Sequence, residues 1–144
     1  YHSAANKAKM AANIPLADAD RWDWLIQLRE AALQRLRAAG VAGVVVTCSA
    51  LKHKYRDVMR VAAYRHPSVR IHFLYLRADE QLLLQRLRAR RGHYMKPAMV
   101  HSQLQLLEEP DAEGDAVAVD CAASPAEVLR RVRAAVRAAL HEHP

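Results

Sequence analysis

Three side chains within residues 48–57 have types and spacing that could bind a ligand. Lys52 and Arg56 lie four residues apart and fall on one face of the helix expected over residues 52–64. Ser49 adds a hydroxyl where small residues let the chain turn. Two cations beside a hydroxyl suit an anionic or polyhydroxylated molecule. An ordinary turn before a solvated basic helix face would give the same pattern, so the residues alone leave both interpretations open.

A second basic cluster lies at the end of the helix expected over residues 80–91. Arg86 and Arg90 are one helical turn apart, and Gly92 comes two residues later. Arginine's planar donor fork matches phosphate oxygens, so this cluster indicates an anion clamp on a mobile loop. The alternative is a solvated arginine-rich helix end, where positive charge complements the helix dipole.

Apolar runs indicate the fold that must position these clusters. Residues 43–48 carry consecutive valines, as a strand buried on both faces does. Further strands are expected at 71–76 and 116–120, with helices between them. This alternation predicts an α/β fold, a three-layer parallel sheet with flanking helices in one domain over residues 1–144. Ligands bind outside the carboxyl ends of strands in such sheets, where Ser49 would lie.

Local signals predict where several helices begin. The expected N-cap residues are Ser3, Asp20, Asp79 and Ser124. Pro97 is expected to start a further helix, since its fixed backbone angle suits a first turn.

The composition restricts the classes of partner. The 144 residues carry a formal charge of +7, but arginines are spread over several of the expected helices and aromatic residues are only 6%, too few for a base-stacking surface. No apolar run approaches the about 20 residues of a membrane span. We therefore expect neither nucleic acid nor a membrane as a partner. Cys48 and Cys121 lack metal-ligand spacing, so no metal ligands are expected, and free thiols fit a reducing cytoplasm.

Five blocks, in order along most of the chain, resemble the P-loop gluconokinases of the adenylate-kinase-like fold. The blocks are His2…Asn6-x-x-Lys9-Met10; Ile14-Pro15-Leu16-x-Asp18-x-Asp20-Arg21-x-x-Trp24-Leu25; Cys48-Ser49-Ala50-Leu51-Lys52-x-x-Tyr55-Arg56-Asp57; Arg86-Leu87-x-x-Arg90-x-Gly92-His93-Tyr94-Met95; and Ser102-Gln103-x-x-Leu106-Leu107-Glu108. Ser3 and Asp23 stand where that family usually has proline.

The resemblance implies an ATP-dependent kinase that converts D-gluconate to 6-phospho-D-gluconate, with ATP and Mg²⁺ as cofactors. Arg86 and Arg90 would act on the nucleotide phosphates from a lid at about residues 88–100, and Gly92 would permit its turn. A homodimer is one option for the assembly. The residues that the resemblance assigns to the sugar acid are His2, Asn6, Lys9, Ser49, Lys52 and Arg56.

The family's phosphate-binding glycine loop is missing from these residues. None of the four glycines is followed by lysine, so no Gly-x-x-x-x-Gly-Lys-Ser/Thr sequence is present. We therefore expect an N-terminally truncated chain that lacks the first βαβ portion and is inactive by itself. The alternative is a non-catalytic remnant that binds a partner or regulates. An in-frame glycine loop in the codons upstream of Tyr1 would favour the enzyme.

Overall fold

The computed structural model describes residues 1–12, 14–89 and 97–141. The chain divides into two compact units, each with buried apolar residues of its own. The first unit comprises Tyr1–Arg70 and Gly92–Glu108, and the second comprises Ile71–Arg91 and Glu109–Pro144.

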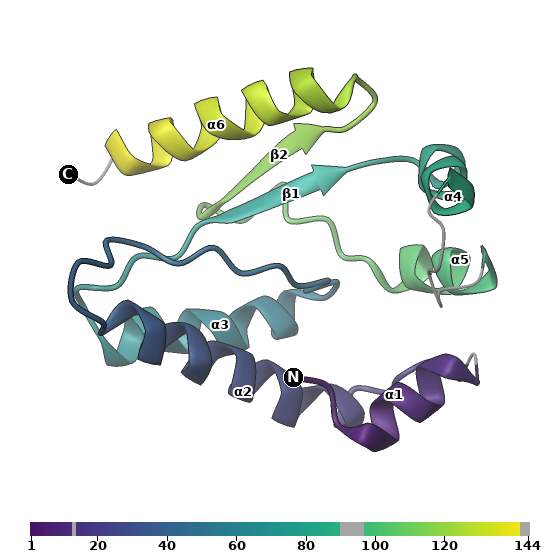
Figure 1. Cartoon of the computed structure of the whole chain (residues 1–144), viewed down its shortest axis with the longest axis horizontal. Helices are drawn as coiled ribbons and strands as arrows, with labels where there is room; N and C mark the ends of the chain where they lie inside the picture. The colour runs from purple at the N-terminus through teal and green to yellow at the C-terminus, as the bar shows by residue number, and fades with distance from the viewer. Residues whose placement is uncertain (13, 90–96, 142–144) are drawn as a thin grey trace. The chain divides into compact units, whose positions relative to one another are not determined.

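The first unit is built from helices. They are α1 (Ala4–Ala11), α2 (Ala19–Leu36), α3 (His53–Arg65) and α5 (Pro97–Leu106), of which the last begins at the expected proline. α2 and α3 lie side by side (Figure 1) and pack together. Leu25 and Leu28, one turn apart on α2, are buried, as are Tyr55 and Ala62 on α3. Because α2 packs against α3, the residues that come just before each of these helices are held in place.

The second unit contains a small parallel sheet. β1 (Phe73–Arg77) and β2 (Ala116–Asp120) pair in parallel, with Phe73 opposite Ala116. α4 (Glu80–Ala89) follows β1, while α6 (Pro125–His141) follows β2 and packs against it (Figure 1). Among the helices that the structure describes, none is long and apolar enough to cross a membrane.

Three of the four predicted N-caps are confirmed. Ser3, Asp79 and Ser124 each accept a hydrogen bond from the backbone N–H three residues later, at 3.1, 2.7 and 3.3 Å. The prediction for Asp20 is wrong, because α2 begins one residue before it. The Asp20 carboxylate instead accepts a hydrogen bond from the N–H of Ala17, outside the helix, at 2.9 Å.

The α/β class and the parallel pairing of the strands near 71–76 and 116–120 are confirmed. The strand expected over residues 43–48 is not formed, since residues 41–51 have no regular secondary structure and Val45 is 95% exposed. Valine supplies β-propensity, but a strand also needs a neighbouring backbone to satisfy its N–H and C=O groups. In the described part of the chain no segment pairs with this run, so the sheet there has two strands.

Candidate functional site

α1 is held against the start of α2 by polar contacts. The buried Asn6 side chain donates from Nδ2 to the carbonyl oxygen of Asp20 at 2.6 Å. Lys9 Nζ pairs with the Asp20 carboxylate, also at 2.6 Å. The Lys9 ammonium and the N–H of Ala17 hold the pKa of Asp20 below its ordinary value. Two side chains assigned to the sugar acid therefore lie at the start of α2.

Asp18 connects the start of α2 to the start of α3. Its carboxylate accepts a hydrogen bond from Lys52 Nζ at 3.3 Å, and further hydrogen bonds from Lys54 Nζ and the Tyr55 hydroxyl. These donors, with Lys54 the strongest, hold the pKa of Asp18 well below its ordinary value. Burial and the adjacent carboxylate raise the pKa of Tyr55 to about 12, so its hydroxyl remains a donor at neutral pH.

Two separate sequence blocks thus meet at residues 18–20. Lys9, from the first block, reaches Asp20, and Lys52, from the third block, reaches Asp18. Both lysine side chains are partly exposed, so a dissolved anion can reach their ammonium groups. We call residues 18–20 the acidic turn.

Aromatic rings lie beneath the cations beside the acidic turn. Tyr55 is 2% exposed, and the centroid of its ring lies 5.5 Å from Arg21 Cζ and 5.8 Å from Lys52 Nζ. Trp22 meets the same ring edge-on, with 5.6 Å between centroids. Because a ring face attracts a nearby cation, Tyr55 helps to fix the positions of both side chains.

His2 lies against α2 through a stacked ring. Its imidazole stacks on the Trp24 indole, with 4.2 Å between centroids and 20° between the ring planes. Burial, followed by the positive charges of Arg21 and Lys7, lowers the pKa of His2. The imidazole is therefore neutral at pH 7, when it has one N–H donor and one acceptor nitrogen.

Arg56 is buried and holds the turn that precedes α3. Its Nη1 and Nη2 donate to the carbonyl oxygens of Ala50 and Glu108, at 2.7 and 2.9 Å. Ala50 has a φ of +36°, in the left-handed region that a residue with a Cβ rarely adopts, and these contacts help to hold it there. Ser49 is exposed beside it. This geometry gives Arg56 a structural part, and substrate contacts by Arg56 and Ser49 stay predictions.

The arginines assigned to the nucleotide are only partly described. Arg86 is exposed on α4, and its Nη2 donates to the carbonyl oxygen of Cys121 at 2.7 Å, just beyond β2. Arg90 and Gly92 lie outside the described residues, as does most of the lid expected at about 88–100. The lid and its arginines therefore stay predictions.

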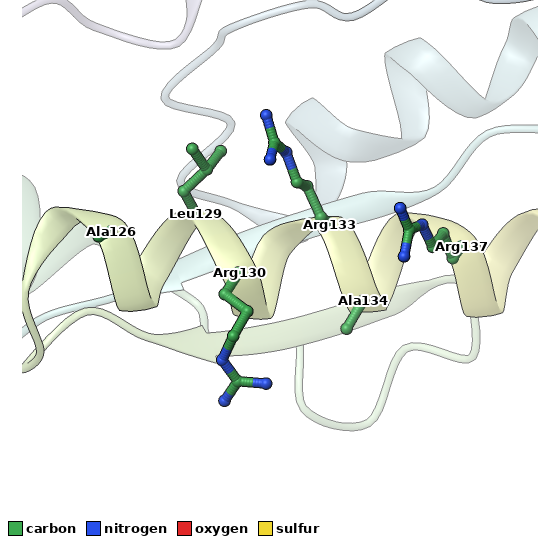
Figure 2. A pocket seen from close by; sticks show the side chains of 6 residues that line it. All are labelled: Ala126, Leu129, Arg130, Arg133, Ala134 and Arg137. Atoms are coloured by element: carbon green, nitrogen blue, oxygen red, sulfur yellow. The ribbon is translucent and has the colours of Figure 1, made fainter.

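An open depression lies on α6 in the second unit (Figure 2). Its volume is about 520 Å³, and its side chains point in different directions instead of converging on one point. A single helix face cannot enclose a substrate, so we place the candidate site at the acidic turn. The lining residues all belong to α6 and are Ala126, Leu129, Arg130, Arg133, Ala134 and Arg137.

The sequence did not identify Asp18, Arg21, Lys54 or Tyr55 as candidate site residues. The hydrogen bond between Asp18 and Tyr55 joins residues 37 positions apart, so no local spacing predicts it. The sequence did hold one indication that these residues belong to the site. Asp18, Arg21 and Tyr55 occur in the blocks that resemble the family, close to residues already assigned to the site.

Comparison with known proteins shows closely related sequences. The chain is 44% identical over 112 residues to a probable gluconokinase of Schizosaccharomyces pombe, covering 78% of this chain and 58% of that protein. It is 40% identical over 138 residues to the thermosensitive gluconokinase of Escherichia coli, covering 95% of this chain and 70% of that protein. The chain thus spans less than two thirds of the length of the yeast relative. No protein-family profile matches it.

A solved structure has the same fold. The crystal structure of a gluconokinase from Sinorhizobium meliloti 1021 superimposes with a TM-score of 0.77 at 37% identity, covering 99% of this chain and 78% of that one. The sequence and structure comparisons therefore agree that the chain is similar to gluconokinases.

Proposed function

Because the chain belongs to the gluconokinase family, we propose that the protein phosphorylates D-gluconate with ATP, giving 6-phospho-D-gluconate and ADP. The observation that carries this proposal is the meeting of Lys9 and Lys52 at the acidic turn. Those cations come from separate blocks, and the buried amide of Asn6 donates to the carbonyl oxygen of Asp20 in the same turn. Ammonium groups and an amide are suited to a molecule with one carboxylate and several hydroxyls.

The part that we assign to these side chains is to bind and orient the sugar acid. In the reaction, the terminal hydroxyl oxygen of gluconate forms a bond to the γ-phosphorus of ATP. The bond from that phosphorus to the bridging oxygen breaks, ADP leaves, and the hydroxyl proton goes to solvent. Phosphoryl transfer depends mainly on positioning and on charge stabilisation, so a fixed sugar acid is what this unit contributes.

Fewer residues can be assigned to the binding of the nucleotide and its metal ion. Arg86 and Arg90 are proposed to contact ATP phosphates, but the glycine loop that cradles them in P-loop kinases is not among these residues. The described residues contain no group of three or more histidine, cysteine or carboxylate side chains that could hold a metal ion. No described residue is therefore assigned to Mg²⁺, and no step is assigned to it. Two free cysteines support the proposal of a cytoplasmic location.

A coupled assay for ADP release tests the proposal. The protein expressed from its complete gene is given ATP with D-gluconate, and in parallel with D-glucose and D-glucitol. We expect release that depends on gluconate and far exceeds that with the neutral sugars. Equal turnover of D-glucose, or ADP release that ignores gluconate, would refute the proposal.

A further inference from the structure

Arg21 is a buried cation whose hydrogen bonds are incomplete. It lies in the first turn of α2 and is 7% exposed. Its Nη2 donates to the carbonyl oxygen of Leu16 at 3.0 Å. Its Nε is buried and has no hydrogen-bond partner among the described residues. Burying a charged group without satisfying its donors is costly, so such a donor in a native fold calls for an explanation.

Arg29 provides the comparison within the same helix. It is 9% exposed, nearly as buried as Arg21. Its Nε and Nη2 donate to the Glu30 carboxylate at 2.9 and 2.6 Å, and its Nη1 donates to the carbonyl oxygen of Val58 at 3.2 Å. α2 can therefore bury an arginine with all three nitrogens satisfied, and Arg21 departs from that pattern.

The neighbouring carboxylates are occupied by other cations. Asp18 accepts hydrogen bonds from Lys52, Lys54 and Tyr55, and Asp20 accepts from Lys9. Among the described residues neither carboxylate accepts a hydrogen bond from Arg21. The guanidinium therefore keeps one donor that no described residue satisfies.

A second buried polar atom without a partner lies one helical turn away. His2 stacks on Trp24, which is three residues after Arg21 on α2, so the imidazole and the guanidinium are held by adjacent turns of one helix. His2 Nδ1 is buried and has no partner within the described ranges. One unsatisfied atom is a donor of the charged Arg21 guanidinium, and the other is a nitrogen of the His2 imidazole. A guanidinium would recognise a carboxylate, and an imidazole would recognise a hydroxyl.

We propose that Arg21 binds the carboxylate of the sugar acid and that His2 binds the hydroxyl on the neighbouring carbon. This inference rests on the proposed function and specifies which end of the substrate the first unit recognises. The carboxylate then enters against the start of α2 over the Tyr55 ring, while the terminal hydroxyl points away to receive the phosphoryl group. An α-hydroxy acid offers a carboxylate to the guanidinium and a hydroxyl to the imidazole, whereas a polyol of the same length offers the guanidinium only uncharged acceptors.

Kinetics of Arg21→Gln in the protein from the complete gene test the inference. We expect the KM for gluconate to rise roughly 10- to 150-fold with kcat nearly unchanged, because a charge-assisted hydrogen bond away from the reacting hydroxyl is lost. Arg21→Lys should fall between wild type and Arg21→Gln. Arg29→Gln is the control, since it also removes a buried arginine of α2 but should leave the KM for gluconate within about 2-fold, as its contacts stay within the protein.

The outcomes separate this inference from the proposed function. Wild-type protein that does not phosphorylate gluconate refutes both. Wild-type protein that does so, while Arg21→Gln raises the KM for gluconate no more than Arg29→Gln, refutes the inference alone.

Nuclear magnetic resonance of the wild-type protein avoids any dependence on how a variant folds. The side-chain Nε–H signals of Arg21 and Arg29 are followed as gluconate or D-glucitol is added. We expect gluconate to shift the Arg21 signal and to leave the Arg29 signal in place, and D-glucitol to shift neither. An Arg21 signal that ignores gluconate, or that responds equally to D-glucitol, would overturn the assignment.

Discussion

At the acidic turn, two carboxylates accept hydrogen bonds from three lysines, so the local charge balance depends on pH. Lys52 and Lys54 contact Asp18, and Lys9 contacts Asp20. These pairs link α1, α2 and α3. Protonating a carboxylate therefore removes a local negative charge and also weakens the contacts between these elements.

Replacing Asp18 with asparagine should remove part of the pH dependence of stability. The folded pKa of Asp18 is depressed, so its contribution to the free energy of unfolding is present above the ordinary value of about 3.9 and is lost as pH falls through the folded pKa. Asp18→Asn should therefore be less stable than wild type at pH 7 and approach it below pH ~4. Urea unfolding at several pH values measures this, and a difference that stays constant with pH would contradict it.

Replacing Arg56 with alanine should destabilise the protein. The variant removes a buried charged donor from two part-buried hydrogen bonds, to the carbonyl oxygens of Ala50 and Glu108, which should cost about 3–5 kcal/mol. Arg60→Ala is the control, because Arg60 pairs with Asp57 at 2.8 Å on an exposed surface, where a pair contributes about 1 kcal/mol or less. Equal urea midpoints for the two variants would show that the Arg56 contacts have little weight.

At the scale of elements, α1 is short and depends on its cap. It has eight residues and carries both Asn6 and Lys9, while isolated helices below about 12 residues are marginal in water. The stability of α1 should therefore influence how well the sugar acid binds.

Ser3→Ala tests this link between the cap and the site. Losing the hydrogen bond from the Asn6 N–H should cost about 1 kcal/mol and raise the KM for gluconate up to about 5-fold, with kcat unchanged. Ser124→Ala removes the matching cap of α6, which carries no predicted site residue. It should cost a similar free energy and leave the KM alone. An equal rise in both variants would mean that the effect of Ser3 is general instability.

The elements also show how far the sequence could predict the fold. The caps at Ser3, Asp79 and Ser124 depend on neighbours within one turn, and they were predicted correctly. The prediction of a strand over residues 43–48 was wrong. A strand must pair with the backbone of a distant segment, and a run of valines does not determine whether such a segment is present. Asp18 bonds to Tyr55 and Arg56 bonds to Glu108, and each of these hydrogen bonds joins residues tens of positions apart. The spacing of residues in the sequence could therefore predict neither contact.

At the scale of the whole molecule, the 144 residues alone should not turn over ATP. Without a Gly-x-x-x-x-Gly-Lys-Ser/Thr loop, no backbone cradle for the β- and γ-phosphates is present in this sequence. The assay compares the 144-residue chain with the product of the complete gene at equal concentration. Gluconate-dependent ADP release by the 144-residue chain above the rate without enzyme would contradict the prediction.

Hydrogen–deuterium exchange with and without gluconate tests most directly whether the acidic turn and the elements beside it bind the sugar acid. The protein from the complete gene is used, and exchange is followed by mass spectrometry of its peptides. We predict that gluconate slows exchange in peptides covering residues 2–10, 16–24 and 49–56, and leaves residues 125–141 of α6 unchanged. Slowed exchange confined to α6, or no change in the first three segments at saturating gluconate, would contradict the proposed site.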